Sequence, residues 1–262
     1  MRVDGIAYDT AGTGDPVVLL HGGFLDRHSW DAEFALLSAT HHVVRYDARG
    51  HGESDGATGD YATYEDLITL LDHLGLQRVT GVGLSLGART LIDAALLHPQ
   101  WFAALVLVSP GYSGMELTDP FVLAQYKAAA DAKDPDALVE ASLRAWLDGP
   151  HRSPEEVDPA VRERCRTAGH KAAAKLRGEG RIREVGAAGR FGDLTMPVDV
   201  VLGDLDSIDI LAAGERIAAE APDTRIHRIA GAGHSLNLDR PAAFAAVLRA
   251  FLSGRAVPPR ST

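Results

Sequence analysis

The stretch Arg78-Val-Thr-Gly-Val-Gly-Leu-Ser-Leu-Gly-Ala88 decides the fold prediction, because it places a serine between two glycines where two elements meet. The apolar run 78–83 predicts a strand, and residues 86–98 predict a helix. Ser85 would then stand on a tight strand-to-helix turn, with a strained backbone and its hydroxyl exposed above the sheet. The flanking glycines would let the helix and a neighbouring strand come close together. The same pattern also occurs in ordinary turns, so a nucleophilic role for Ser85 needs support from the rest of the chain.

The composition of the chain excludes several classes of function. Its 262 residues are 46% apolar and 24% charged, as in a soluble globular protein, and the net charge of −10 argues against binding nucleic acid or an anionic membrane. The longest apolar run, Trp101–Val108, is too short to cross a bilayer, and the first residues hold no signal-peptide core. We therefore expect a cytoplasmic protein. The single cysteine, Cys165, excludes an internal disulfide, and its charged helical setting argues against a catalytic thiol.

Strand and helix patterns alternate along most of the chain, which predicts an α/β fold with a mainly parallel sheet covered by helices on both faces. Val3–Tyr8 alternates weakly and is predicted to be an antiparallel edge strand. The other predicted strands are 17–20, 42–46, 78–83, 104–108, 198–202 and 224–229. The predicted helices of this part are 30–39, 63–74, 86–98, 210–221 and 241–252.

The alternation breaks between about residues 111 and 193, where no strand pattern occurs. Helical stretches are predicted near 119–132, 135–148 and 154–178, each with a proline close to its start, where the first helical turn accepts it. This length argues for a helical insertion and against a loop. The predicted organisation is an α/β core of residues 1–111 and 193–254, a helical insertion of residues 112–192, and a disordered tail of residues 255–262.

A serine nucleophile needs a base, and the base needs a group that orients it. In open parallel sheets such groups gather at the carboxyl ends of the strands. Of the eleven histidines, only His234 follows the last strand in a glycine-rich loop. Asp206 follows the strand 198–202 and is the favoured acid, with Asp204 and Asp209 as alternatives. Asp204 could equally be a turn residue and Asp209 a helix cap.

An oxyanion formed at Ser85 would need two N–H donors. The N–H of Leu86 lies next after the serine at a helix N-terminus and is the first candidate. The second should come from the loop after the strand 17–20, His21-Gly-Gly-Phe-Leu-Asp26, where we assign it to Gly23, with Phe24 as the alternative. The same loop could be a simple tight turn.

Four blocks of the sequence resemble the α/β-hydrolase superfamily, in the branch of small esterases, 3-oxoadipate enol-lactonases, aryl esterases and C–C hydrolases. They are Leu20-His-Gly-Gly-Phe-Leu-Asp26, Val44-Arg-Tyr-Asp-Ala-Arg-Gly-His-Gly-Glu-Ser54, Gly81-Val-Gly-Leu-Ser-Leu-Gly87 and Gly231-Ala-Gly-His-Ser-Leu-Asn-Leu-Asp-Arg-Pro241. The resemblance implies an eight-stranded, mostly parallel sheet with a helical cap inserted after strand six. It also implies Ser85 as nucleophile, Asp206 as orienting acid and His234 as base, and it makes the second block a structural turn without catalytic residues.

The resemblance implies a cofactor-free serine hydrolase that cleaves an ester or lactone of a small, largely apolar molecule. Related dehalogenases and epoxide hydrolases carry aspartate at the position of Ser85, so a serine there favours acyl transfer. No metal-ligand spacing or nucleotide-binding fingerprint is found in the sequence. Trp146 and Phe24 are the predicted substrate contacts, although Trp146 could instead pack the cap onto the core. A C–C bond hydrolase, a lactone-forming enzyme and a non-catalytic binding protein remain alternatives, and the sequence leaves monomer and homodimer open.

Overall fold

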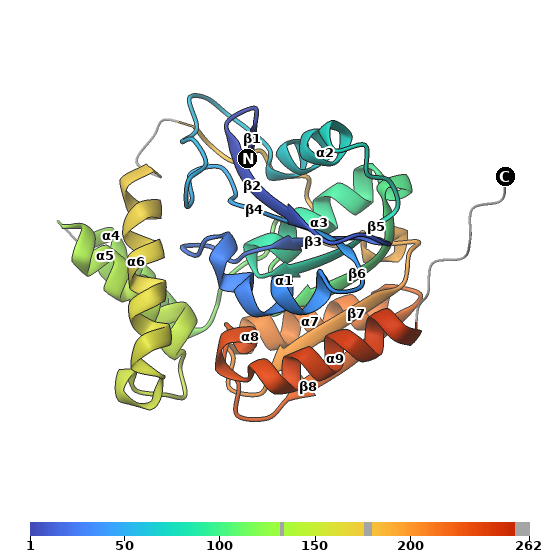
Figure 1. Ribbon diagram of the computed structural model, residues 1–262. Helices are drawn as coiled ribbons and strands as arrows, with labels where there is room; N and C mark the ends of the chain where they lie inside the picture. The colour runs from blue at the N-terminus through green and yellow to red at the C-terminus, as the bar shows by residue number, and fades with distance from the viewer. Residues whose placement is uncertain (132–133, 176–179, 255–262) are drawn as a thin grey trace, which may run out of the picture.

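The computed structural model describes residues 1–131, 134–175 and 180–254, and it is built around a sheet of eight strands (Figure 1). The strand order is β1-β2-β4-β3-β5-β6-β7-β8. All pairings from β4 to β8 are parallel, and only β1 and β2 are antiparallel to their neighbours. The predicted α/β fold is therefore confirmed. The strands are β1 (Arg2–Val3), β2 (Ile6–Ala11), β3 (Pro16–Leu20), β4 (His42–Tyr46), β5 (Val79–Leu84), β6 (Phe102–Val108), β7 (Val198–Gly203) and β8 (Thr224–Ile229).

The N-terminal edge of the sheet differs from the prediction of one strand over Val3–Tyr8. Asp4 and Gly5 have φ angles of 46° and 80°, so the chain turns back there and β1 pairs with β2. β2 then continues to Ala11 and pairs with β4. The predicted antiparallel edge is therefore confirmed, but the predicted bounds were wrong, because the Asp-Gly pair, which is a turn signal, was included in the strand.

Two apolar layers cover the two faces of the sheet, as a buried parallel sheet requires. Side chains of β3 alternate between them: Val18 and Leu20 pack with residues of α2, α3 and α7, whereas Val17 and Leu19 pack with residues of α1 and α9. The helices of this part are α1 (Asp31–Leu37), α2 (Thr63–His73), α3 (Leu86–Leu97), α7 (Ile208–Glu220), α8 (Leu236–Asp239) and α9 (Pro241–Gly254).

The chain between β6 and β7 forms the helical insertion, which stands beside the sheet in Figure 1. It consists of α4 (Pro120–Asp131), α5 (Pro135–Leu143) and α6 (Pro159–Lys175). Two predicted helices differ in detail. The helix predicted over 135–148 changes into a π-helical turn at Arg144–Asp148, and the one predicted from 154 has only a 3-10 turn, Pro154–Glu156, before α6 begins. The predicted tail, 255–262, lies outside the described residues.

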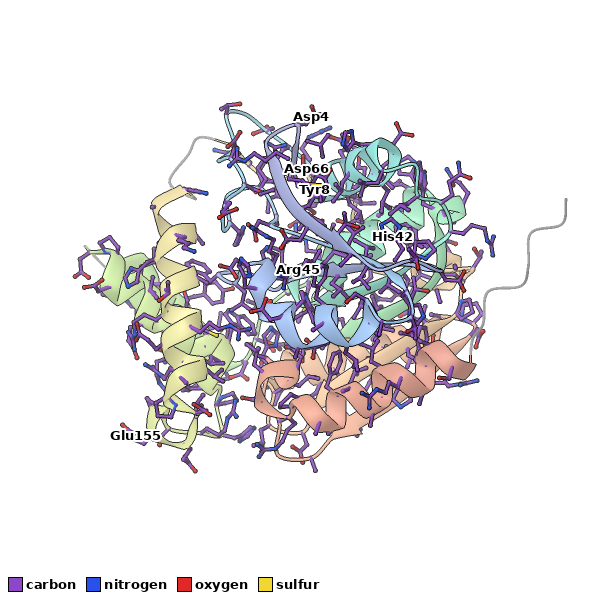
Figure 2. The ribbon with its side chains drawn as sticks, in the orientation of Figure 1. Asp4, Tyr8, His42, Arg45, Asp66 and Glu155 are labelled. Carbon is purple, nitrogen blue, oxygen red and sulfur yellow. The ribbon has the colours of Figure 1, made fainter. Side chains whose placement is uncertain are left out.

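Ion pairs tie the first strands to the helix that follows them. Arg45, labelled in Figure 2, lies on β4. Its Nε is 3.1 Å from an Asp9 oxygen on β2, and its Nη1 is 2.5 Å from an Asp31 oxygen on α1. Because the strands β3 to β8 are parallel, the loops after their carboxyl ends meet at one edge of the sheet. None of the helices within the described ranges is long and apolar enough to span a membrane.

Candidate active site

Ser85 occupies the turn between β5 and α3, in a backbone conformation that side chains rarely adopt. Its φ is 52° and its ψ is −105°, and its N–H donates to the carbonyl of Val108 at 2.9 Å. The two flanking glycines make the turn possible. A Cβ on Gly83 would lie 2.5 Å from the carbonyl carbon of Gly87, and a Cβ on Gly87 would lie 2.3 Å from the carbonyl oxygen of Leu20. The predicted strand-to-helix turn is therefore present, with the strain expected of it.

His234 and Asp206 lie together at the carboxyl ends of β8 and β7. The Nδ1 atom of His234 is 3.0 Å from Asp206 Oδ2 and 3.1 Å from Oδ1, and the two residues are 4% and 2% exposed. A carboxylate in this place accepts the Nδ1 proton and leaves Nε2 as the acceptor nitrogen of the neutral ring. This is the arrangement of a general base and its orienting acid.

The alternative acids have other partners. Asp204 accepts a hydrogen bond from the N–H of Gly231 at 2.7 Å, which fits the turn role considered from sequence. Asp209 accepts from the hydroxyl and the N–H of Thr118 and from the N–H of Asp119, at 2.6–2.8 Å. Asp209 therefore fastens the start of the insertion to α7, and only Asp206 contacts the histidine.

The loop after β3 brings Gly22, Gly23 and Phe24 to the same cavity wall as Ser85. It closes in a turn, in which the N–H of Leu25 donates to Gly22 O at 3.2 Å and Phe24 has a φ of 58°. The N–H of Leu86 is among the first N–H groups of α3, which have no acceptor within the helix. Gly23 and Leu86, the two candidate donors, thus both line the cavity that Ser85 lines.

His21 holds this loop in place. Its Nδ1 is 2.7 Å from Gly22 O, and its Nε2 accepts the N–H of Ala48 at 2.9 Å. These two bonds need a neutral ring, and burial lowers the pKa of His21 accordingly. Burial likewise lowers the pKa of His51, whose ring centroid is 5.2 Å away, to about 3. Both rings are therefore uncharged supports of the turn beside the site.

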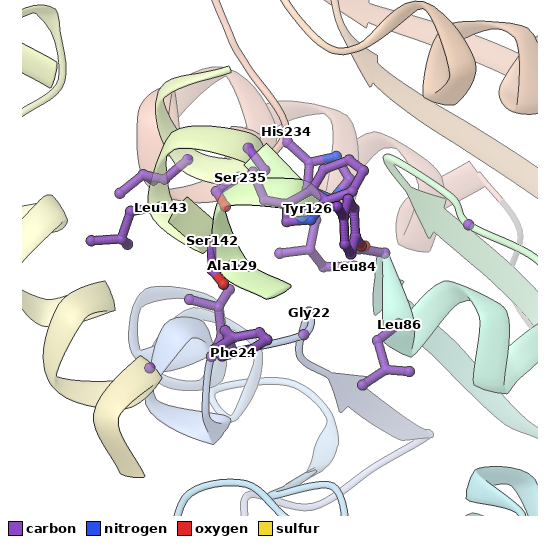
Figure 3. Close-up of a pocket in the computed structure, with 18 of the residues that line it drawn as sticks. Gly22, Phe24, Leu84, Leu86, Tyr126, Ala129, Ser142, Leu143, His234 and Ser235 are labelled. Carbon is purple, nitrogen blue, oxygen red and sulfur yellow. The ribbon is translucent and has the colours of Figure 1, made fainter. Parts of the chain in front are cut away.

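A cavity of about 650 Å³ lies between the insertion and this edge of the sheet, and Ser85 and His234 both line it. Figure 3 shows His234 on the cavity wall, together with Phe24 and Leu86 of the core and Tyr126 of the insertion. Its walls are mostly apolar. The insertion contributes α4, α5, the π turn and part of α6. The lining side chains from these segments include Tyr126, Ala129, Leu138, Val139, Leu143, Trp146, Leu147 and Cys165. Met115 adds to them from the start of the insertion, and the core adds Phe24, Leu84 and Leu86.

Aromatic side chains of the insertion lie directly over the histidine. The Trp146 ring centroid is 4.6 Å from that of His234, and the Tyr126 ring lies edge-to-face with Trp146, with centroids 6.2 Å apart. Trp146 and Phe24 therefore both line the cavity, as the sequence predicted. Tyr126 was missed, because one tyrosine on an otherwise alanine-rich helix carries no motif.

Two arginine side chains on the cavity wall form ion pairs with carboxylates. Arg49 donates to both carboxylate oxygens of Asp66, at 3.0 and 2.6 Å, and Arg89 donates to Glu184 at 2.7 Å.

Burial raises the pKa of the Cys165 thiol to about 12, which disfavours the thiolate that a nucleophile needs. In the part of the chain that the structure describes, no three His, Cys, Asp or Glu side chains are grouped as metal ligands.

A serine on a strained strand-to-helix turn and a histidine bound to a carboxylate, each at the end of a parallel strand, are features of the α/β-hydrolases. The comparison with protein families agrees: the profile of the alpha/beta hydrolase fold matches residues 15–241. The chain belongs to the α/β-hydrolase family.

Individual relatives align with nearly the whole chain. A Bacillus subtilis protein provisionally named 2-succinyl-6-hydroxy-2,4-cyclohexadiene-1-carboxylate synthase is 28% identical over 267 residues, 95% of this chain and 96% of its own. A solved N-acyl homoserine lactone degrading enzyme has a TM-score of 0.78 at 26% identity, over 95% of this chain and 98% of its own. A thermophilic esterase from Thermogutta terrifontis has a TM-score of 0.77 at 25% identity, over 95% and 93%.

Proposed function

We propose that the protein is a cofactor-free serine hydrolase that cleaves the carboxylic ester or lactone of a small, largely apolar molecule. The observation that carries the proposal is the contact of His234 Nδ1 with Asp206 at 3.0 Å, on a cavity that Ser85 shares. The similarity to a lactone-degrading enzyme and to an esterase supports the same reaction class.

In the proposed reaction, the substrate lies between the insertion and the sheet edge. His234 Nε2 takes the proton of Ser85 as its Oγ forms a bond to the carbonyl carbon. The carbonyl oxygen becomes an oxyanion, which the N–H groups of Gly23 and Leu86 bind, each donor contributing a factor of about 10²–10³ to the rate. The carbon–oxygen bond then breaks, and the leaving alcohol takes the proton from His234.

Water completes the proposed cycle. His234 removes a proton from a water molecule, whose oxygen attacks the acyl carbon, and the acid leaves as Ser85 regains its proton. Asp206 stays ionised throughout and stabilises the protonated ring. Phe24 and Trp146 would contact the apolar part of the substrate.

A panel of p-nitrophenyl esters, aliphatic lactones and vinylogous β-diketones tests the proposal. We expect Ser85-dependent turnover of esters or lactones with acyl chains that the cavity can hold. Cleavage of diketones without any turnover of esters or lactones would replace the proposal with C–C bond hydrolysis on the same residues. The synthase name of the Bacillus subtilis relative is the reason to include substrates outside the ester class.

A further inference from the structure

A buried ion pair joins the insertion to the loop that carries His234. Arg152 Nη2 lies 3.0 Å from Asp239 Oδ2, and the two side chains are 9% and 4% exposed. Arg152 follows the π turn of the insertion, whereas Asp239 ends the short helix α8 that begins just after His234. The pair therefore connects two segments that are far apart in the sequence.

On the insertion side, the arginine holds the π turn by its backbone. Its Nη2 donates to the carbonyl of Leu147 at 2.6 Å and its Nε to the carbonyl of Asp148 at 3.0 Å. These carbonyls directly follow Trp146. The Asp148 side chain, fully buried, accepts from Arg162 at 3.0 Å, so the end of the π turn is fixed from two directions.

On the core side, the carboxylate holds the histidine loop. Asp239 Oδ2, the oxygen that meets Arg152, also accepts the N–H of Gly233 at 2.8 Å. Gly233 immediately precedes His234. A Cβ at this glycine would lie 2.2 Å from Arg152 Nη2, so the arginine can reach its place only because residue 233 has no side chain.

We propose that Arg152 is a positioning residue that, through Asp239, keeps the His234 ring in contact with the Trp146 ring. One end of the link fixes the peptide before His234, and the other fixes the turn that holds Trp146 against that ring at 4.6 Å. Arg152 need not touch the substrate. The inference rests on the proposed role of His234 as base, but the geometry can be tested without any turnover.

The charges of Arg152 and Asp239 should affect the protonation of His234 in opposite directions. Besides Asp206, which bonds to the ring itself, four charged groups contact the His234 loop. Asp239 and Arg152 meet it at Gly233, whereas Asp204 and Arg240 meet it at Gly231, farther from the histidine. Removing the arginine charge leaves an unpaired carboxylate beside Gly233, which favours the protonated form of His234. Removing the aspartate charge leaves an unpaired guanidinium, which disfavours it. The two substitutions should therefore act in opposite directions.

Tryptophan emission as a function of pH measures the protonation of His234, because indole fluorescence changes when a ring packed against it gains a charge. The chain has three tryptophans, so Trp146→Phe identifies the part of the signal that belongs to the contact with His234. The test variants are Arg152→Gln and Asp239→Asn, with their double variant. Arg166→Gln is the matched control, since Arg166 pairs with Glu140 inside the insertion.

We expect the midpoint of the Trp146-dependent titration to move to higher pH in Arg152→Gln and to lower pH in Asp239→Asn. The double variant should return it towards wild type, and Arg166→Gln should leave it unchanged. On a substrate found with the ester and lactone panel, Arg152→Gln should lower kcat on the order of 10- to 100-fold, with a smaller effect on KM.

Two results would overturn the proposal: shifts of the same sign in both single variants, or an Arg152→Gln titration that matches Arg166→Gln. Gly233→Ala gives a further check, because the added methyl displaces Arg152. It should reproduce the effect of Arg152→Gln in the wild type and add little in an Arg152→Ala background; equal effects in both backgrounds would also count against the link. A failure to cleave any ester or lactone would refute the proposed function and leave these titrations interpretable.

Discussion

The indole ring of Trp146 lies against the imidazole ring of His234, with centroids 4.6 Å apart and an interplanar angle of 43°. Trp146 belongs to the helical insertion and His234 to the loop after the last strand of the sheet. This contact brings an insertion side chain to the proposed base, next to the cavity where the substrate would lie. In the proposed reaction, this contact links the recognition of the substrate to the proton transfer at His234.

Shortening Trp146 should impair turnover without unfolding the protein. Trp146→Ala removes the ring that packs on His234, so we expect kcat/KM for an apolar ester to fall on the order of 10- to 100-fold. Trp146→Phe keeps an aromatic ring and should lose much less. Steady-state kinetics on both variants measure the difference, and equal activities would show that the contact has no role in the reaction.

Removing the charge of Asp206 should nearly abolish activity. Asp206→Asn would let the amide stabilise the wrong tautomer of His234, and in serine proteases the equivalent change costs about 10⁴-fold in kcat. Circular dichroism and thermal melting should show an intact fold. Asp204→Asn is the matched control, because Asp204 only accepts the N–H of Gly231, and its activity should stay near that of wild type. Comparable losses in both variants would remove the distinction between the two acids.

The backbone strain at Ser85 should appear as a gain in stability when glycine replaces it. The φ of 52° and ψ of −105° are unfavourable for serine and alanine but accessible to glycine. We expect Ser85→Gly to exceed Ser85→Ala in free energy of unfolding by about 1 kcal/mol, after the entropy that glycine adds to the unfolded chain. Urea unfolding of the two variants measures this difference in free energy.

Ser142 offers the control for this comparison, because it lies within the helix α5. There Ser142→Gly should be less stable than Ser142→Ala by about 1 kcal/mol. If glycine is also the weaker choice at position 85, the turn is not strained.

A buried carboxyl on α1 should make stability depend on pH. Burial raises the pKa of Glu33 from 4.5 to about 7, with Asn237, Arg164 and Asp31 as its polar neighbours. The folded state then holds a proton that the unfolded state loses first, so this group weakens folding as the pH rises from about 4.5 to about 7. Above pH 7 the cost is constant.

Glu33→Gln removes this effect. Relative to wild type, its free energy of unfolding should be similar at pH 4 and higher at pH 8, by at most about 3 kcal/mol. Urea titrations at both pH values measure the difference, with the exposed Glu163→Gln as control. A difference between Glu33→Gln and wild type that does not change with pH would contradict the assignment of a protonated Glu33.

The sequence was sufficient to predict where the candidate site residues lie, because parallel strands impose their placement. Ser85, Asp206 and His234 each follow a strand, and parallel strands bring the loops at their carboxyl ends to one edge. The close approach of the backbone at Gly83 and Gly87 could also be predicted, because the turn admits no larger residue at these positions. The predicted bounds of the first strand were wrong at Asp4-Gly5, because this pair forms a turn between two strands.

Contacts across the cavity could not be predicted from sequence. Trp146 was proposed to lie near the substrate, but its contact with His234 depends on the π turn at Arg144–Asp148, which no pattern in the sequence marks. The pairing of Arg152 with Asp239 joins residues whose positions are set by the packing of the insertion on the core. Local propensity contains no information about such packing.

Labelling with a fluorophosphonate probe tests the central claim most directly, because the probe bonds covalently to an activated serine hydroxyl. We expect the wild-type protein to be labelled at Ser85, as identified by mass spectrometry of the modified peptide, and Ser85→Ala to remain unlabelled. Labelling should also fall sharply in His234→Ala, which lacks the base. A wild-type protein that labels no better than Ser85→Ala would contradict the account of Ser85 as a nucleophile.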